Sequence, residues 1–198
     1  MPSLFEAQIR HAEFYLHVLE HADELYLQGD DALVQGLTLL DISWPNIQRG
    51  QAWAAGHMAS DGPAVRICSD YPNLGRNCLA LRQHPREQIQ WLLIGFEAAR
   101  KLKRRSTEGI HLGNLGTAHV ELGDYKTASS YFRGRLGIAR EIGDRRGEHK
   151  VLSNLGVTYK NMGEPQLAID HYLQCLEILR ETKDQRSEAI VLGNLVQI

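Results

Sequence analysis

Hydrophobic positions in the C-terminal half of the chain recur at helical spacing. Leu152, Leu155, Tyr159 and Met162 follow at steps of three and four residues, which places them on one face of a helix. Gly163 comes next, where a helix often ends in a left-handed residue. A second apolar stripe then follows, built from Ala168, Ile169, Tyr172, Leu173, Leu176 and Leu179. The pattern predicts two antiparallel helices joined by a short turn.

This pattern occurs twice and begins a third time, with a 40-residue period. The segments LGNLGTAHVELGDY, LSNLGVTYKNMGEP and LGNLVQI start at Leu112, Leu152 and Leu192. The second helix repeats at the same period, because Ala128 corresponds to Ala168. A single hairpin cannot bury its own apolar stripe, so we expect successive hairpins to stack into a continuous core.

The sequence therefore predicts an all-α fold, a right-handed superhelix (α-solenoid) of antiparallel helix hairpins with about nine helices. Divergent N-terminal helices are expected at residues 1–70, packing on a repeat array at 71–198. Within the array we expect a degenerate repeat at 71–107, clear repeats at 108–147 and 148–187, and the first helix of a truncated repeat at 188–198.

Glycine and proline positions predict where the upstream helices begin and end. Residues 10–28 are strongly helical, and Gly29 and its neighbours to residue 31 should break the helix. Pro45 should kink or divide the next helical stretch. Residues 60–63 read as a turn followed by a helix start, and Pro85 suits the first turn of a later helix.

The pattern L-x-N-L-G-x-x-Y, then G-[DE]-x-x-x-A and an aromatic residue four positions later, resembles the tetratricopeptide repeat family. The clear match covers residues 106–198. His119 replaces the family's tyrosine, and Arg135 and Cys175 stand where a small residue is usual. The longer 40-residue period resembles the Pins/LGN spindle-orientation adaptors and kinesin light chains. The helical segments upstream more weakly resemble the tetratricopeptide region of bacterial STAND-type regulators.

The resemblance implies a protein–protein interaction module that binds a peptide or protein segment in a concave groove, as part of a larger scaffold or signalling protein. Asparagines recur one repeat apart, and in the resembling adaptors asparagines at this place contact bound peptides. A side-chain amide both donates and accepts, so it can bond an extended peptide backbone. An alternative is that these asparagines only set repeat packing. The expected groove residues are Asn114, Thr117, Glu121, Lys150, Ser153, Asn154, Val157, Lys160, Asn161 and Asn194.

Two other interpretations concern the context of the chain. It could be the sensor or regulatory domain of a STAND-type ATPase or transcription regulator, although no P-loop motif occurs in it. The chain also stops inside a first helix, which leaves Leu192, Leu195 and Val196 without the next hairpin. We therefore expect a fragment of a longer protein, or self-association through this open C-terminal face.

Catalytic patterns are scarce in the sequence. His17, Glu20 and His21 match the inverted zincin motif H-x-x-E-H, which makes a zinc-dependent hydrolase a remote alternative. A five-residue motif arises easily by chance in a chain with nine histidines, so we expect these to be surface histidines of a helix. We expect a protein that is not an enzyme and has no catalytic residue, metal or cofactor.

The composition and charge of the chain argue against nucleic acid and membranes as partners. Of 198 residues, 43% are hydrophobic and 23% are charged, as in a folded soluble protein. The net charge of −2 argues against nucleic acid as the partner. No apolar run approaches the roughly 20 residues of a membrane span. Three widely separated cysteines and the absence of a recognisable signal peptide indicate a reducing, cytoplasmic location.

Overall fold

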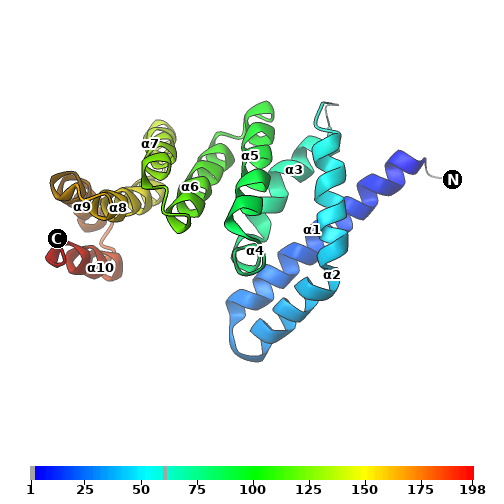
Figure 1. The fold of residues 1–198 in the computed structure, drawn as a ribbon, viewed down its shortest axis with the longest axis horizontal. Coiled ribbons are helices and arrows are strands. Elements are labelled where there is room, and N and C mark those ends of the chain that lie inside the picture. Colours follow the sequence, from blue (N-terminus) through cyan, green and yellow to red (C-terminus); the bar gives the residue numbers. More distant parts are fainter. Residues whose placement is uncertain (1–2, 60–61) are drawn as a thin grey trace. The chain divides into compact units, whose positions relative to one another are not determined.

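The computed structural model describes residues 3–59 and 62–198 of the chain (Figure 1). These residues form ten α-helices and no strand, so the predicted all-α fold of helix hairpins is confirmed and the expected helix count was one too low. The helices are α1 (Leu4–Gln28), α2 (Asp30–Gly56), α3 (Pro63–Leu74), α4 (Arg76–Arg82), α5 (Pro85–Lys101), α6 (Arg105–Glu121), α7 (Tyr125–Glu141), α8 (Arg145–Asn161), α9 (Pro165–Glu181) and α10 (Gln185–Val196). In this described part of the chain no helix is long and apolar enough to cross a membrane.

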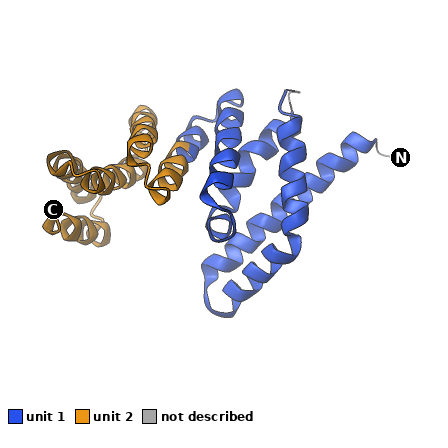
Figure 2. Cartoon of the chain, in the orientation of Figure 1, with its two compact units in different colours: residues 1–111 blue, residues 112–198 orange. Residues whose placement is uncertain are grey.

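The chain divides into two compact units, residues 1–111 and 112–198, with the division inside α6 (Figure 2). Each unit has a hydrophobic core of its own. The core of unit 1 includes Leu40, Tyr71 and Trp91, and that of unit 2 includes Phe132 and Tyr172. The boundary between the compact units does not test where the repeat array begins, so its predicted start after residue 70 stays a prediction.

In unit 1, α1 and α2 pack along each other as a long hairpin (Figure 1). Gly29 joins them with φ +78°, so the predicted break is confirmed. Pro45 lies inside α2 and does not divide it. Pro45 is exposed, and so is Asp41, whose carbonyl would have bonded the missing N–H; water can satisfy that carbonyl instead.

The following helices of unit 1 are shorter and less regular. Ser60 and Asp61 of the predicted turn lie outside the described residues, but α3 starts at Pro63 as expected. Gly75 separates α3 from the seven-residue α4, and this interruption supplies the extra helix. The predicted start of α5 at Pro85 is also confirmed.

Unit 2 is regular, because the same local chemistry recurs along it. The helices α7, α8 and α9 each have 17 residues. The turns contain left-handed residues at Gly123, Gly143, Gly163 and Lys183, with φ between +57° and +75°. The helices α7, α8 and α10 start after an aspartate whose carboxylate accepts the backbone N–H three residues on, namely Asp124, Asp144 and Asp184.

Close packing within each hairpin depends on one glycine. A Cβ on Gly156 of α8 would overlap the ring of Tyr172 on α9, and a Cβ on Gly116 of α6 would overlap the ring of Phe132 on α7. The glycine of the NLG motif therefore lets an aromatic side chain of the second helix lie against the backbone of the first.

Candidate functional site

A hollow of about 290 Å³ lies along α8 in unit 2. The first helix of one repeat, α8, and that of the next, α10, form its sides, and the second helix α9 contributes to its floor. The lining residues are His149, Lys150, Ser153, Asn154, Cys175, Leu179, Ser187, Ile190 and Val191. Three of the ten predicted groove residues, Lys150, Ser153 and Asn154, are thus brought together on one side of this hollow.

The hollow has a buried floor and an exposed polar side. Cys175, Leu179 and Val191 are almost fully buried, and the Cys175 thiol donates to the His149 carbonyl oxygen at 3.1 Å. Lys150 and Asn154 are exposed on the α8 side. The Asn154 amide makes no hydrogen bond with any other residue that the structure describes, whereas the Asn154 carbonyl accepts from Thr158 at 2.7 Å. The arrangement can hold an apolar side chain below and bond polar groups above.

The other predicted groove residues lie outside this hollow. Asn114 is half-buried on α6, and its amide nitrogen is enclosed without a partner among the described atoms. Thr117 and Glu121 are exposed on α6. The Thr117 hydroxyl donates to the Gly113 carbonyl at 3.2 Å.

At the far end of α8 the predicted residues have mixed surroundings. Val157 packs on the core of unit 2, and the Lys160 ammonium donates to Gln197 at 3.2 Å. Asn161 is exposed at the last turn of the helix, and Asn194 is half-buried on α10.

A second hollow of about 360 Å³ adjoins the first at the N-terminal half of α8. The two share His149, Lys150 and Ser187, and the second adds Arg146, Thr182 and Asp184. The predicted groove residues did not include His149 or the three α10 residues that line the hollow, Ser187, Ile190 and Val191. Comparison with the preceding repeat could have indicated Ile190, since it occupies the position equivalent to Lys150.

The family model for the tetratricopeptide repeat matches residues 106–181 of the chain. This segment consists of tetratricopeptide repeats. It contains α8 and α9, and therefore most of the residues that line the hollow. The tetratricopeptide fold is typically not enzymatic, and no catalytic family is indicated. No curated protein sequence matches the chain.

Solved structures share the fold over nearly the whole chain. One is a signal transduction ATPase with numerous domains (STAND) with a tetratricopeptide repeat sensor, from Pyrococcus horikoshii, with a TM-score of 0.72 and 15% identity. The match covers 93% of this chain and 27% of that one. Another is BtubC (BKLC) from P. vanneervenii, with a TM-score of 0.62, 15% identity, and coverage of 98% and 82%. At this identity the likeness concerns the fold.

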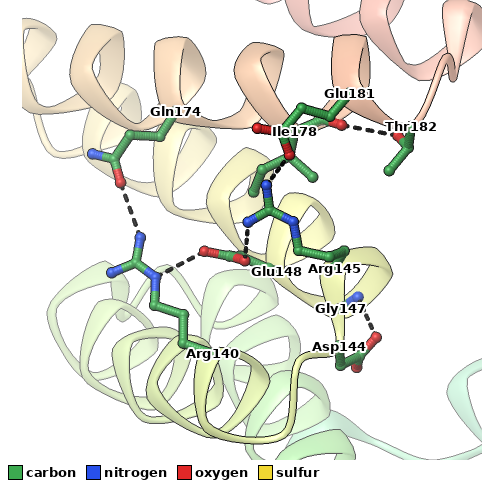
Figure 3. Close-up of polar contacts among 9 residues, drawn as sticks. All are labelled: Arg140, Asp144, Arg145, Gly147, Glu148, Gln174, Ile178, Glu181 and Thr182. Carbon is green, nitrogen blue, oxygen red and sulfur yellow. Dashed lines mark hydrogen bonds and ion pairs between the residues drawn. The ribbon is translucent and has the colours of Figure 1, made fainter.

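An ion-pair network links three helices of unit 2 (Figure 3). The guanidinium groups of Arg140 and Arg145 both bond the buried Glu148 carboxylate, at 2.8 and 2.9 Å. Arg140 also donates to Gln174 at 3.1 Å, and Arg145 pairs with Glu181. The network joins α7, α8 and α9, which holds the groove-lining face of α8 in a fixed position.

The histidines of the zincin match lie on an exposed face of α1. His17 Nδ1 is 3.5 Å from Glu20, and His21 Nδ1 is 3.7 Å from Glu24. Within residues 3–59 and 62–198, no group of three or more histidine, cysteine, aspartate or glutamate side chains is arranged to hold a metal ion. The geometry of the motif is that of neighbouring side chains on a helix surface.

Proposed function

We propose that the groove between α8 and α10 binds a segment of another protein. The observation that carries the proposal is the hollow of about 290 Å³, in which Lys150, Ser153 and Asn154 stand over a buried floor. Asparagine and lysine side chains can bond the carbonyls and amides of an extended segment. The floor at Leu179 and Val191 can receive one apolar side chain of that segment.

The helices that form this groove are held in place before a partner binds, which lowers the entropic cost of binding. The helices that form it are packed by the Gly156–Tyr172 contact and by the network around Glu148. A partner segment therefore meets a surface already in place, and its own ordering is the main entropic cost of binding. We infer the same groove register for Asn114 and Asn194 in the neighbouring repeats.

The wider role that we propose is a scaffold or signalling protein of the cytoplasm, without enzymatic activity of this chain. The partner would be a protein or peptide rather than nucleic acid or a membrane. The cysteines Cys68, Cys78 and Cys175 are buried and unpaired, which is compatible with a reducing compartment.

The test is affinity capture of partners with the full chain and its Asn154→Ala variant. Asn154 is exposed, so we expect capture to weaken about tenfold while the melting temperature stays nearly unchanged. Gln166→Ala is the control, since Gln166 is an exposed amide on α9 outside the hollow. Equal capture by the wild type and Asn154→Ala would count against the proposal. A collapse of the melting temperature would make Asn154 a packing residue.

A second candidate function is supported by the fold match over 93% of the chain to the STAND protein with a tetratricopeptide repeat sensor. In this alternative the chain senses a ligand and regulates a nucleotide-binding domain. The chain spans 27% of that neighbour, so such a domain would belong to a longer protein. Reading the surrounding coding sequence tests this: a P-loop motif upstream favours the sensor, and its absence removes it.

A further inference from the structure

Arg135 is a buried arginine at a position of the second helix where the tetratricopeptide family usually has a small residue. It lies on α7 and is 8% exposed. Its Nη2 donates to Asp144 Oδ2 at 2.5 Å, while its Nη1 is enclosed without a partner among the described atoms. Enclosing a charged donor that lacks an acceptor is unfavourable. Stability alone therefore does not account for an arginine at this position.

The Arg135 side chain extends between the first helices of two successive repeats. On one side, its Cγ lies 3.8 Å from the place that a Cβ on Gly113 of α6 would occupy. On the other side, its guanidinium lies against Gly147 of α8, where an added Cβ would overlap Nη2. Gly147 thus leaves the space that the guanidinium fills, in an interior that is otherwise closely packed.

One repeat later, the same two positions border a hollow. Cys175 and Ser187 are the equivalents of Arg135 and Gly147, and both line the hollow of about 290 Å³ below Asn154. A large side chain beside a glycine in one repeat is thus replaced by two small side chains in the next. The space between the first helices is filled in the first case and open in the second.

The apolar floor is present in both repeats. Leu179 and Val191 form the floor of the hollow, and their equivalents one repeat earlier are Ala139 and Val151. Ala139 and Val151 are both buried. The first repeat therefore has the apolar residues that a second hollow would need, and Arg135 lies beside them.

The start of α8 does not explain the arginine. The Asp144 carboxylate accepts from the Gly147 backbone N–H at 2.8 Å, which caps that helix. The same cap forms at the start of α10, where Asp184 accepts from the Ser187 backbone N–H at 3.1 Å in a repeat without an equivalent arginine. The cap thus does not require Arg135.

We propose that Arg135 closes the counterpart of the hollow in the first clear repeat, and thereby restricts the groove to one apolar anchor below Asn154. The inference rests on the proposed function of the groove and adds its specificity. The bound segment would place a single apolar side chain between α8 and α10. Over Arg135 the segment would meet a filled surface, which a large apolar side chain cannot enter.

The spacing of a second anchor follows from helix dimensions. Neighbouring helices lie about 10 Å apart, and an extended segment advances about 3.3 Å per residue. A second hollow one repeat away would therefore take a side chain about three residues from the first anchor. Arg135 determines whether the groove selects that second side chain.

The experiment exchanges the two residue pairs between the repeats of the full chain. The open variant combines Arg135→Cys with Gly147→Ser, and the closed variant combines Cys175→Arg with Ser187→Gly. Arg133→Cys is the control, since Arg133 is an exposed arginine of the same helix α7. Crystal structures should show a second hollow in the open variant, a filled one in the closed variant, and no change in the control.

A library of random peptides displayed on phage measures the specificity. The wild type and the control should select peptides with one apolar position. The open variant should select peptides with two, about three residues apart. Peptides selected by the wild type should bind the closed variant at least about tenfold more weakly, because one apolar side chain is no longer buried.

Two results overturn the proposal: an open variant whose structure has no second hollow, or one that selects the same single-anchor peptides as the wild type. If circular dichroism shows that the open variant does not fold, Arg135→Ala takes its place, since it removes the guanidinium and keeps Gly147. A wild type that selects no peptide contradicts the proposed function of the groove. The crystal structures decide separately whether Arg135 closes the hollow, so the two failures are distinguishable.

Discussion

The two units hold their helices together by different kinds of contact. In unit 2 the contacts recur at the repeat period: Arg140 binds Glu148 and Arg180 binds Glu188, both at 2.8 Å. In unit 1 the contacts occur once. Asp23 of α1, 6% exposed, accepts from both the backbone N–H and the side chain of Asn77 at the start of α4.

A second unrepeated contact lies deeper in unit 1. The Tyr71 hydroxyl donates to the Ala12 carbonyl at 2.9 Å, directly over Gly50, where a Cβ would collide with it. Where contacts repeat, each one contributes a small part of the unfolding free energy. Where a buried contact occurs once, a larger part of that free energy depends on a few residues. Single substitutions should therefore have larger effects in unit 1 than in unit 2.

The tryptophans make this comparison measurable. Trp44, Trp53 and Trp91 all lie in unit 1, and unit 2 contains none. Tryptophan fluorescence therefore reports unfolding of unit 1, while circular dichroism reports the helices of both units.

The largest effect is expected for Asp23→Ala. The carboxylate accepts three hydrogen bonds, from Asn77 N at 2.9 Å, Asn77 Nδ2 at 2.7 Å and Cys78 N at 2.8 Å. Removing it leaves three donors without their acceptor, the Cys78 N–H buried and those of Asn77 half-buried, so unit 1 should lose about 4 kcal/mol of unfolding free energy. Urea unfolding followed by tryptophan fluorescence measures the loss.

Asp124→Ala is the matched control in unit 2. Its carboxylate accepts from the Thr127 backbone N–H at 3.1 Å and lies 3.2 Å from His119 Nδ1, at the exposed start of α7. Loss of such a cap costs about 1 kcal/mol. If both variants lose the same free energy, the contrast between concentrated and distributed stability is wrong.

Acid should destabilise unit 1 through His111. Its Nε2 donates to the Ser69 carbonyl at 3.1 Å, so the unprotonated Nδ1 is buried without a partner among the described atoms. Burial lowers the pKa of this imidazole from 6.5 to about 4, outweighing the Ser69 bond. The unfolded chain therefore binds the proton first, and stability is lost as the pH falls from 6.5 toward 4, by about 3 kcal/mol in full.

The residues at the equivalent position of the other repeats suggest the variant that tests the pH effect of His111. The equivalents of His111 in the next two repeats are Val151 and Val191, both buried. In His111→Val the extra loss of stability between pH 6.5 and 4 should disappear from fluorescence-detected unfolding. Identical pH profiles for the variant and the wild type would exclude His111 as the cause.

A smaller effect is expected in unit 2 from Gly156→Ala. The added methyl overlaps the Tyr172 ring, so α8 and α9 must move apart at a cost of about 2 kcal/mol. Circular dichroism should show the loss while tryptophan fluorescence does not. Gly137→Ala, whose Cβ would meet nothing within 4 Å, should instead stabilise α7 by up to about 1 kcal/mol. A loss in both variants would point to backbone strain rather than ring contact.

Much of unit 2 could be predicted from the sequence because its determinants are local and repeat. The turns, the caps and the NLG glycine each depend on residues within one hairpin. The structure explains why His119 can replace the tyrosine that is usual in the family. The ring centroids of His119 and Tyr131 lie 5.3 Å apart, and those of Tyr159 and His171 lie 5.1 Å apart. The two residue types exchange places between repeats, which is visible only when both helices are compared together.

The rest depends on tertiary contacts that no local pattern contains. Asp23 reads as a helix-surface residue, and nothing near it in sequence indicates that it binds α4. In the groove, Lys150 and Asn154 were predicted from one helix, whereas the depth of the hollow depends on how α10 packs beside α8. Asn114 and Asn154 share a motif, yet the Asn114 amide nitrogen is enclosed and Asn154 is exposed, a difference that the motif does not contain.

The smallest effects are expected at the turns between repeats. Gly143 and Lys183 occupy equivalent left-handed positions, with φ +69° and +57°. Gly143→Lys should cost about 1 kcal/mol, because a side chain is strained there. Lys183→Gly should gain less than about 1 kcal/mol, since relief of strain is offset by the greater freedom of glycine in the unfolded chain. Thermal unfolding followed by circular dichroism measures both changes. A loss of stability in Gly143→Lys together with a gain in Lys183→Gly would show that the two turns place the same conformational demand on this position. A loss of stability in Lys183→Gly would mean that the lysine side chain itself stabilises the last turn. The two turns would then share a backbone conformation but differ in the side-chain contacts that stabilise it.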